Sequence, residues 1–208
     1  PYLLRGLGFP IHPFLRGLLE FYGLQLHNFT PAFILYIAGY VALCELFLGC
    51  EAHFELSKRL FCLVPRTQKG SLYQVGGAEM WRITDTGYLS GTPKKPSEVW
   101  PSEWFYMEDV PLPDPVRQGL PEFNNAPLKK RQSWLPRIPQ AEDNGEVLYL
   151  MNRIKALAQS GLTITKVMSI CIMRGVQPLQ YRGHPLWCYN GQMTPLPAGV
   201  RVRTMLPL

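Results

Sequence analysis

The feature that most constrains the fold is a long uncharged run near the start of the chain. From Phe21 to Cys44, 24 consecutive residues carry no formal charge. A transmembrane helix needs roughly 20 mostly apolar residues without interruption. Polar residues break the first part of this run, and the apolar stretch left before Glu45 is about 14 residues, a length typical of a buried core helix. The run therefore predicts a core helix, and we expect no membrane partner.

Capping residues mark the ends of that helix. Thr30 is a good N-cap, Pro31 suits the first helical position, and Gly49 lies where a C-terminal cap belongs. The pattern predicts one helix over residues 31–48. Because this helix is apolar on nearly every side, we expect other elements to surround it, and we call it the hub helix.

Helix and strand signals follow on both sides of the hub helix. Apolar residues at helical spacing before Gly23 predict a shorter helix, and a mixed pattern ending at Pro65 predicts a third helix. Residues 70–83 contain two β-favouring runs around a Gly-Gly dipeptide, a common hairpin connection. Aromatic residues favour a further strand over residues 102–110. Residues 1–110 are therefore expected to form a helical core plus a small antiparallel sheet.

Prolines divide the chain. Seven of them lie between Pro111 and Pro139, a density that neither a helix nor a central strand tolerates. Residues 111–140 are therefore predicted to be a Pro-rich linker.

Helical periodicity resumes beyond the linker. It predicts helices over residues 146–159 and 163–174, joined by a turn at Gly161, as a C-terminal helical hairpin. This hairpin belongs to residues 141–191, which we expect to pack on the same domain, and residues 192–208 are predicted to be a tail. The predicted fold class is α+β and mainly helical, with N-terminal helices around a buried hub helix, a small antiparallel sheet, a linker and the hairpin.

Charge is distributed unevenly along the chain, whose net charge is +6. Residues 1–110 carry 9 Lys and Arg against 10 Asp and Glu, whereas residues 111–208 carry 12 against 5. A basic half attracts anionic partners such as nucleic acid, although a solvated face rich in lysine and arginine explains the same composition.

The five cysteines form no C-x-x-C pair, which argues against a secreted disulfide framework. We expect an intracellular protein, nuclear or cytoplasmic. Cys50-x-x-His53 and the flanking cysteines offer the N and S atoms that zinc binds. Cys44 and Cys62 fall within predicted helices, however, so no metal and no other cofactor is predicted. The first residue is Pro1 rather than Met, and we expect the chain to be a segment of a longer protein.

Two stretches are candidates for contact with RNA or DNA. Basic residues surround Trp134, a combination that pairs phosphates and stacks a base, although a charged linker explains it equally. The turn between the two C-terminal helices resembles a helix-turn-helix, whose second helix enters the major groove, although plain helical hairpins share it. The predicted contact residues are Lys129, Lys130, Arg131, Trp134, Arg137, Lys166, Arg174 and Arg182.

Catalytic signals are weak. Asp85-Thr86-Gly87 matches the tripeptide around the catalytic aspartate of retroviral-type aspartic proteases, but a β-turn explains the same three residues. No serine lies in a G-x-S-x-G motif, and no phosphate-binding glycine loop is present. We predict no catalytic residue and no enzymatic activity.

Three separated blocks carry a family resemblance. In order, they are Gly8-Phe9-Pro10 with His12-Pro13-Phe14, Trp104-Phe105-Tyr106, and Gln177-Pro178-Leu179-Gln180 with Trp187 and Tyr189. Over residues 6–191 the chain resembles the gypsy-type transposon, or gypsy-type transposase, domain of grass genomes. The resemblance implies an origin in an LTR-retrotransposon-like element and carries no established catalytic residue.

These observations together predict a non-enzymatic domain of a plant retrotransposon-derived protein. We expect a gag-like structural or nucleoprotein role, with RNA or DNA and self-association as its interactions. Two alternatives stay open at this point: a helix-turn-helix-like DNA-binding module over residues 146–174, and a retroviral-type aspartic protease.

Overall fold

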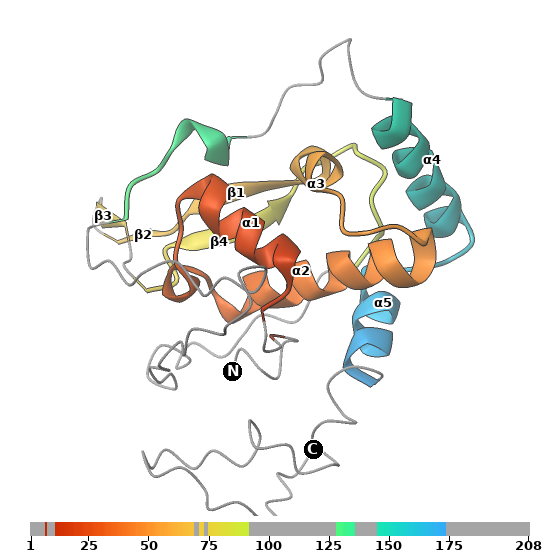
Figure 1. Cartoon of the computed structure of the whole chain (residues 1–208), viewed down its shortest axis with the longest axis horizontal. Helices are drawn as coiled ribbons and strands as arrows, with labels where there is room; N and C mark the ends of the chain where they lie inside the picture. The colour runs from red at the N-terminus through yellow and green to blue at the C-terminus, as the bar shows by residue number, and fades with distance from the viewer. Residues whose placement is uncertain are drawn as a thin grey trace, which may run out of the picture.

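The computed structural model describes residues 7, 11–68, 71–72, 75–91, 128–135 and 145–173. Its helices are α1 (Pro13–Tyr22), the short 3-10 helix η2 (Leu26–Asn28), α2 (Pro31–Ala42) with its π-helical continuation η3 (Leu43–Leu48), α3 (Phe54–Leu60), the 3-10 helix η6 (Gln132–Trp134), α4 (Gly145–Gln159) and α5 (Ile164–Cys171). Its strands are β1 (Phe61–Pro65), β2 (Thr67–Gln68), β3 (Ser71–Leu72) and β4 (Ala78–Arg82). The fold is mainly helical α+β, as the sequence predicts (Figure 1).

The hub helix is formed by α2 and η3, over the predicted residues. The Thr30 hydroxyl accepts a 3.2 Å hydrogen bond from the N–H of Phe33, and Gly49 ends the helix with a left-handed φ of 72°. By length and composition this helix passes for a membrane span, but 61% of it is buried inside the structure. Among its residues Phe33, Tyr40 and Leu43 have no exposed surface, so the hub helix lies at the centre of the core.

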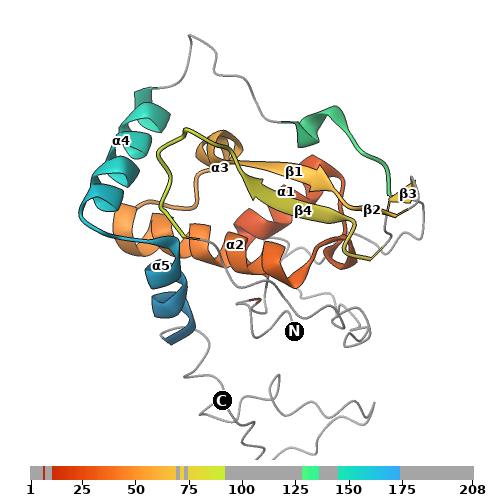
Figure 2. The same ribbon diagram turned by 180° about the vertical axis from the view of Figure 1, so that it is seen from behind.

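Helix α1 lies across one face of the β1–β4 sheet (Figures 1 and 2). Its apolar side is buried through Leu15, Leu18 and Leu19. Gly23 ends the helix with φ 59°, and the N–H of Leu24 reaches back 2.8 Å to the carbonyl of Leu19. A left-handed residue with this bond pattern is a common helix stop and suits glycine.

The sheet corrects one prediction. The third helix ends at Leu60 rather than at Pro65, and residues 61–65 form β1, which pairs antiparallel with β4. Phe61 and Leu63 are buried, while Cys62 between them and Val64 after them are half-buried. Side chains of a strand point alternately to its two faces, and this burial pattern has that two-residue period. Pairing with β4, which begins more than ten residues later, therefore makes residues 61–65 a strand rather than a helix.

The predicted hairpin is also only partly right. Its second half forms β4, but the partner of β4 is β1, while β3 pairs with β2 instead. The dipeptide Gly76-Gly77 lies in the connection, where the N–H of Gly76 donates a 2.8 Å hydrogen bond to the carbonyl of His27. The predicted strand over residues 102–110 lies outside the described residues.

The two C-terminal helices are confirmed at nearly the predicted bounds. Helix α5 packs against α2, and helix α4 packs against α3 and η3. The crossing of α5 over α2 is close at Gly39, where an added Cβ would lie 3.1 Å from Cγ of Met168 and 3.4 Å from Cδ1 of Ile164. Of residues 141–191, the part described is 145–173, and it shares one hydrophobic core with the N-terminal helices.

Candidate functional site

Trp134, predicted to stack on a base, is a core residue. Its side chain is 0% exposed, and its indole N–H donates a 3.3 Å hydrogen bond to the main-chain carbonyl of Tyr22. A base needs an exposed ring face on which to stack, so the predicted stacking role is wrong in this conformation. The residue instead anchors the segment 128–135 against α1 and β1.

Arg131 lies at the C-terminal end of α1, beside Gly23. Gly23 has no side chain, and the Arg131 guanidinium fills the space beside it so closely that any Cβ at Gly23 would overlap it. A cation at a helix C-terminus interacts favourably with the helix dipole. Lys129 and Lys130, which precede it, are exposed. The segment is therefore fixed to the body by Trp134 and presents its lysines to solvent.

Lys166, the predicted contact residue on α5, is exposed, and its ammonium donates a 2.8 Å hydrogen bond to the carbonyl of Gly161. It therefore helps to close the turn between α4 and α5. Each of these two helices packs on N-terminal elements, α5 on α2 and α4 on α3 and η3. Each helix of the pair is thus built into the main core.

The two predicted nucleic-acid sites do not meet. In both views, the segment 128–135 and helix α5 lie at opposite ends of the molecule (Figures 1 and 2). The structure therefore brings together Lys129, Lys130 and Arg131 but leaves Lys166 apart. Three further predicted contacts, Arg137, Arg174 and Arg182, lie outside the described residues.

Sequence reasoning did not find Arg153, which ties α4 to the hub helix. Its guanidinium donates hydrogen bonds to the last carbonyls of η3, 2.6 Å to that of Leu48 and 3.4 Å to that of Phe47. Carbonyls at the end of a helix lack partners within the helix, and a cation there also complements the helix dipole. Because this contact spans more than a hundred positions, no local sequence signal marks it.

Two thiols and a phenol lie beside that helix end. Cys44 and Cys50 lie close enough to influence each other's ionisation. Tyr40, whose hydroxyl donates a 2.6 Å hydrogen bond to the carbonyl of His53, is the phenol beside Cys44. Burial raises the pKa of Cys44 to about 11. Burial also raises the pKa of Cys50, although the neighbouring Cys44 and the Arg153 guanidinium act in the opposite direction. Only the thiolate is a nucleophile or a metal ligand, so these raised pKa values favour a packing role.

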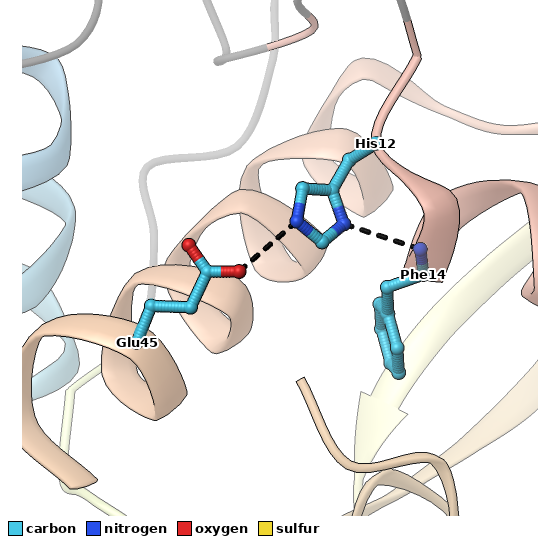
Figure 3. Close-up of polar contacts among 3 residues, drawn as sticks. All are labelled: His12, Phe14 and Glu45. Carbon is cyan, nitrogen blue, oxygen red and sulfur yellow. Dashed lines mark hydrogen bonds and ion pairs between the residues drawn. The ribbon is translucent and has the colours of Figure 1, made fainter. Parts of the chain in front are cut away.

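Two histidines cap helices in the same way. Nδ1 of His12 accepts a 3.1 Å bond from the N–H of Phe14 at the start of α1, and its Nε2 lies 3.0 Å from a carboxylate oxygen of Glu45 (Figure 3). Nδ1 of His53 accepts a 3.2 Å bond from Leu56 at the start of α3, and its Nε2 faces a glutamate carboxylate across 3.8 Å.

The contacts of His12 and His53 decide whether either imidazole could bind zinc or activate a thiol. Both ring nitrogens of His12 are engaged, and the Nδ1 of His53 is committed to a helix cap, so neither imidazole is set up as a base beside a thiol. Across the residues that the structure describes, no group of three or more His, Cys, Asp or Glu side chains is placed to hold a metal ion.

Asp85 lies in a turn after β4. It is exposed and has a left-handed φ of 62°, and Gly87 follows with φ 71°. The hydroxyl of Thr86 donates a 3.1 Å hydrogen bond back to the carbonyl of Ile83. Asp and Gly are the residues that such turn positions favour, so the turn accounts for the Asp-Thr-Gly tripeptide without catalysis.

Comparison with known proteins gives one match. Residues 1–65 match the family model described as "Putative gypsy type transposon". Neither a curated protein nor a solved structure matches the chain. The matched residues contain α1, the hub helix, α3 and β1. They include the block His12-Pro13-Phe14, in which His12 caps α1, Pro13 is its first residue and Phe14 is buried. Residues 1–65 are therefore similar to a gypsy-type transposon family.

Proposed function

We propose that the chain is a non-enzymatic domain of a plant retrotransposon-derived protein, with a gag-like structural or nucleoprotein role. The transposon family match supports the origin. The structural roles of polar side chains support a non-enzymatic domain. His12 and His53 cap helices, and Arg153 donates a hydrogen bond to the last carbonyl of the hub helix. Groups used in this way hold a scaffold together and are not arranged around a reacting atom.

The observation that carries the nucleoprotein role is the pair of exposed lysines on an anchored segment. Lys129 and Lys130 are held in place because Trp134, five and four positions later respectively, is fully buried. A positioned cation loses less conformational freedom when it binds than one on an unfixed chain. Neighbouring lysines pair with phosphates and release counterions on binding, whatever the base sequence.

The test is a salt titration of nucleic-acid binding by the full chain. Fluorescence anisotropy is measured with a labelled single-stranded RNA and a labelled duplex DNA, each without a chosen sequence, between 50 and 200 mM salt, a range over which phosphate contacts weaken strongly. Replacing Lys129 and Lys130 together by Gln should weaken binding at low salt. The slope of log affinity against log salt should fall by about 1.4 for the RNA and about 1.8 for the DNA.

Lys155→Gln is the matched control. It removes one exposed lysine from α4, on another part of the surface, and so reports the effect of net charge alone. Wild-type chain that binds neither nucleic acid at 50 mM salt would remove the nucleoprotein role and leave a structural one. A double variant that loses no more affinity per charge than Lys155→Gln would place the contacts elsewhere.

The same titration tests the DNA-reading alternative over residues 146–174. That alternative predicts that Lys166→Gln weakens binding to duplex DNA more than Lys155→Gln does. The protease alternative predicts peptide cleavage that Asp85→Asn abolishes, and cleavage that survives this substitution would exclude it.

A further inference from the structure

The segment 128–135 is held by the body of the protein in the manner of a bound peptide. Trp134 is buried to 0% exposure and donates its indole N–H to Tyr22 at 3.3 Å. The Arg131 guanidinium fills the space that Gly23 leaves open. Leu128 packs partly buried against the same core. Trp and Arg are among the residues that dominate binding energy at interfaces; here Trp134 is the buried anchor and Arg131 an exposed cation at the helix end.

The spacing of the two anchors fits the local backbone. The N–H of Trp134 bonds to the carbonyl of Arg131 at 3.1 Å within η6. Arg131 is the extended N-cap residue that precedes this turn. Both side chains reach the end of α1, Arg131 beside Gly23 and Trp134 at the carbonyl of Tyr22, so the contact requires an Arg-x-x-Trp segment with this turn.

Chain length does not require the segment to come from the same molecule. Residues 92–127 join it to Gly91, and a chain of that length spans up to about 120 Å when extended. Residues 136–144 join it to α4 and span up to about 30 Å. Both lengths allow the segment to reach the same place on a neighbouring molecule, and exchange of an identical element is a low-cost route to a dimer.

We propose that the end of α1, around Gly23 and the carbonyl of Tyr22, is a docking site for an Arg-x-x-Trp segment, and that a second copy of this chain can fill it in trans. In this structure the site is filled in cis by residues 128–135. The site gives the gag-like role a specific means of self-association. Lys129 and Lys130 stay exposed when the segment is docked, so docking leaves them available to nucleic acid.

The docking site is already filled by residues 128–135 of the same chain, and a peptide or a second copy must compete with them. A tethered segment has an effective concentration of the order of millimolar. A free peptide at micromolar concentration should therefore fail to displace it from the wild-type chain. A chain whose own anchor has been removed should accept the peptide, and a neighbouring copy should do the same at high local concentration.

The first experiment uses the full chain with Trp134→Ala and a fluorescent peptide of residues 127–136. We expect saturable binding to this variant, and at least tenfold weaker binding to the wild-type chain. A peptide with Ala in place of its Trp is the control. Equal binding of the two peptides to a variant that keeps its far-ultraviolet circular dichroism would overturn the proposal.

The second experiment uses two full-length variants, and it remains informative if Trp134→Ala unfolds. Gly23→Asn keeps a residue that tolerates a left-handed helix end but places a side chain where the Arg131 guanidinium lies, so the Arg131 contact is lost and its own segment is held less tightly. Mixed with Trp134→Leu, whose docking site is intact, it should form a one-to-one heterodimer by light scattering. Each variant alone should stay monomeric. A mixture that contains no heterodimer at concentrations near 1 mM would contradict docking in trans.

Discussion

The indole N–H of Trp134 donates a hydrogen bond of 3.3 Å to the main-chain carbonyl of Tyr22, which lies 112 positions earlier in the chain. This bond joins a residue outside the matched transposon segment, residues 1–65, to a helix inside it. Other contacts join the same two parts: β1 pairs with β4, and α5 packs on the hub helix. The segment that matches the transposon family therefore completes its core with elements that follow residue 65.

Arg153→Ala should destabilise the protein. The substitution removes the donors to the carbonyls of Leu48 and Phe47 at the end of the hub helix, and losing hydrogen bonds to a charged group costs about 1–3 kcal/mol. Urea unfolding followed by circular dichroism measures the change. Asn152→Ala, at an exposed position of the same helix, is the control and should change the stability by less than about 0.5 kcal/mol. Equal effects of the two substitutions would show that the Arg153 contacts contribute nothing.

Substitutions at Gly39 test how closely α5 crosses the hub helix. Glycine inside a helix costs about 1 kcal/mol relative to alanine. Gly17→Ala in α1 should gain about that amount, because nothing lies within 4 Å of the added Cβ. Gly39→Ala should gain less, since its Cβ would lie 3.1 Å from Met168, and Gly39→Leu should lose about 1–3 kcal/mol through overpacking. Thermal unfolding of the three variants gives the order of their stabilities. A Gly39→Leu variant more stable than the wild-type protein would contradict the close packing of α5 on α2 at Gly39.

The cap of α1 predicts a difference between two substitutions of His12. Alanine removes the acceptor for the N–H of Phe14 and should cost about 1 kcal/mol, whereas asparagine restores a good N-cap and should cost less. Glu45→Gln removes the charge that faces Nε2 of the histidine, and because both side chains are substantially exposed it should cost under about 1 kcal/mol. Chemical denaturation of the three variants measures these changes in the free energy of unfolding. If His12→Asn is as unstable as His12→Ala, the His12 side chain does not act as a helix cap.

High pH should destabilise the protein. Burial raises the pKa of Cys44 from 9.0 to about 11 and that of Tyr22 from 10.0 to about 12. Between the unfolded and folded pKa values the unfolded chain ionises first and binds fewer protons. The free energy of unfolding is therefore unaffected by these groups below pH 9, and falls as the pH rises through 9–11 for Cys44 and 10–12 for Tyr22. The expected loss is of the order of 1–3 kcal/mol for each group.

Urea unfolding at pH 8, 9, 10 and 11 measures this loss. Cys44→Ala removes one of the buried thiols, so the decline between pH 9 and 10 should become shallower in that variant, although Cys50, Cys62 and Cys171, whose pKa values burial also raises from 9.0, keep part of it. A wild-type stability that does not change between pH 8 and 11 would contradict the burial of both groups.

The hub helix and the two C-terminal helices could be predicted because their signals are local. Thr30 and Gly49 mark the ends of the first, and apolar periodicity with a left-handed Gly161 marks the other two. Such caps act through contacts within a few residues. The family resemblance, likewise, depends on short blocks, one of which lies in the segment that the family model matches.

The predictions that failed depend on distant partners. Residues 61–65 become a strand because β4 lies beside them, and a short apolar run does not itself distinguish a strand from a helix end. Trp134 lies among basic residues and prolines, a composition that favours a linker, and its burial is decided by α1. The contact of Arg153 with the hub helix joins residues more than a hundred positions apart, so nothing near it in the sequence predicts it.

The central claim is that residues 1–65, the segment that matches the transposon family, and the elements after residue 65 form one cooperative core. Amide hydrogen exchange on the full chain with Trp134→Phe tests it most directly. Phenylalanine keeps an aromatic ring but leaves the carbonyl of Tyr22 without its donor, which should cost about 1–3 kcal/mol. We predict that the most protected amides of α2 and α5 lose the same free energy of opening as those near residue 134. A loss confined to residues 128–135, with α2 and α5 unchanged, would contradict the single core.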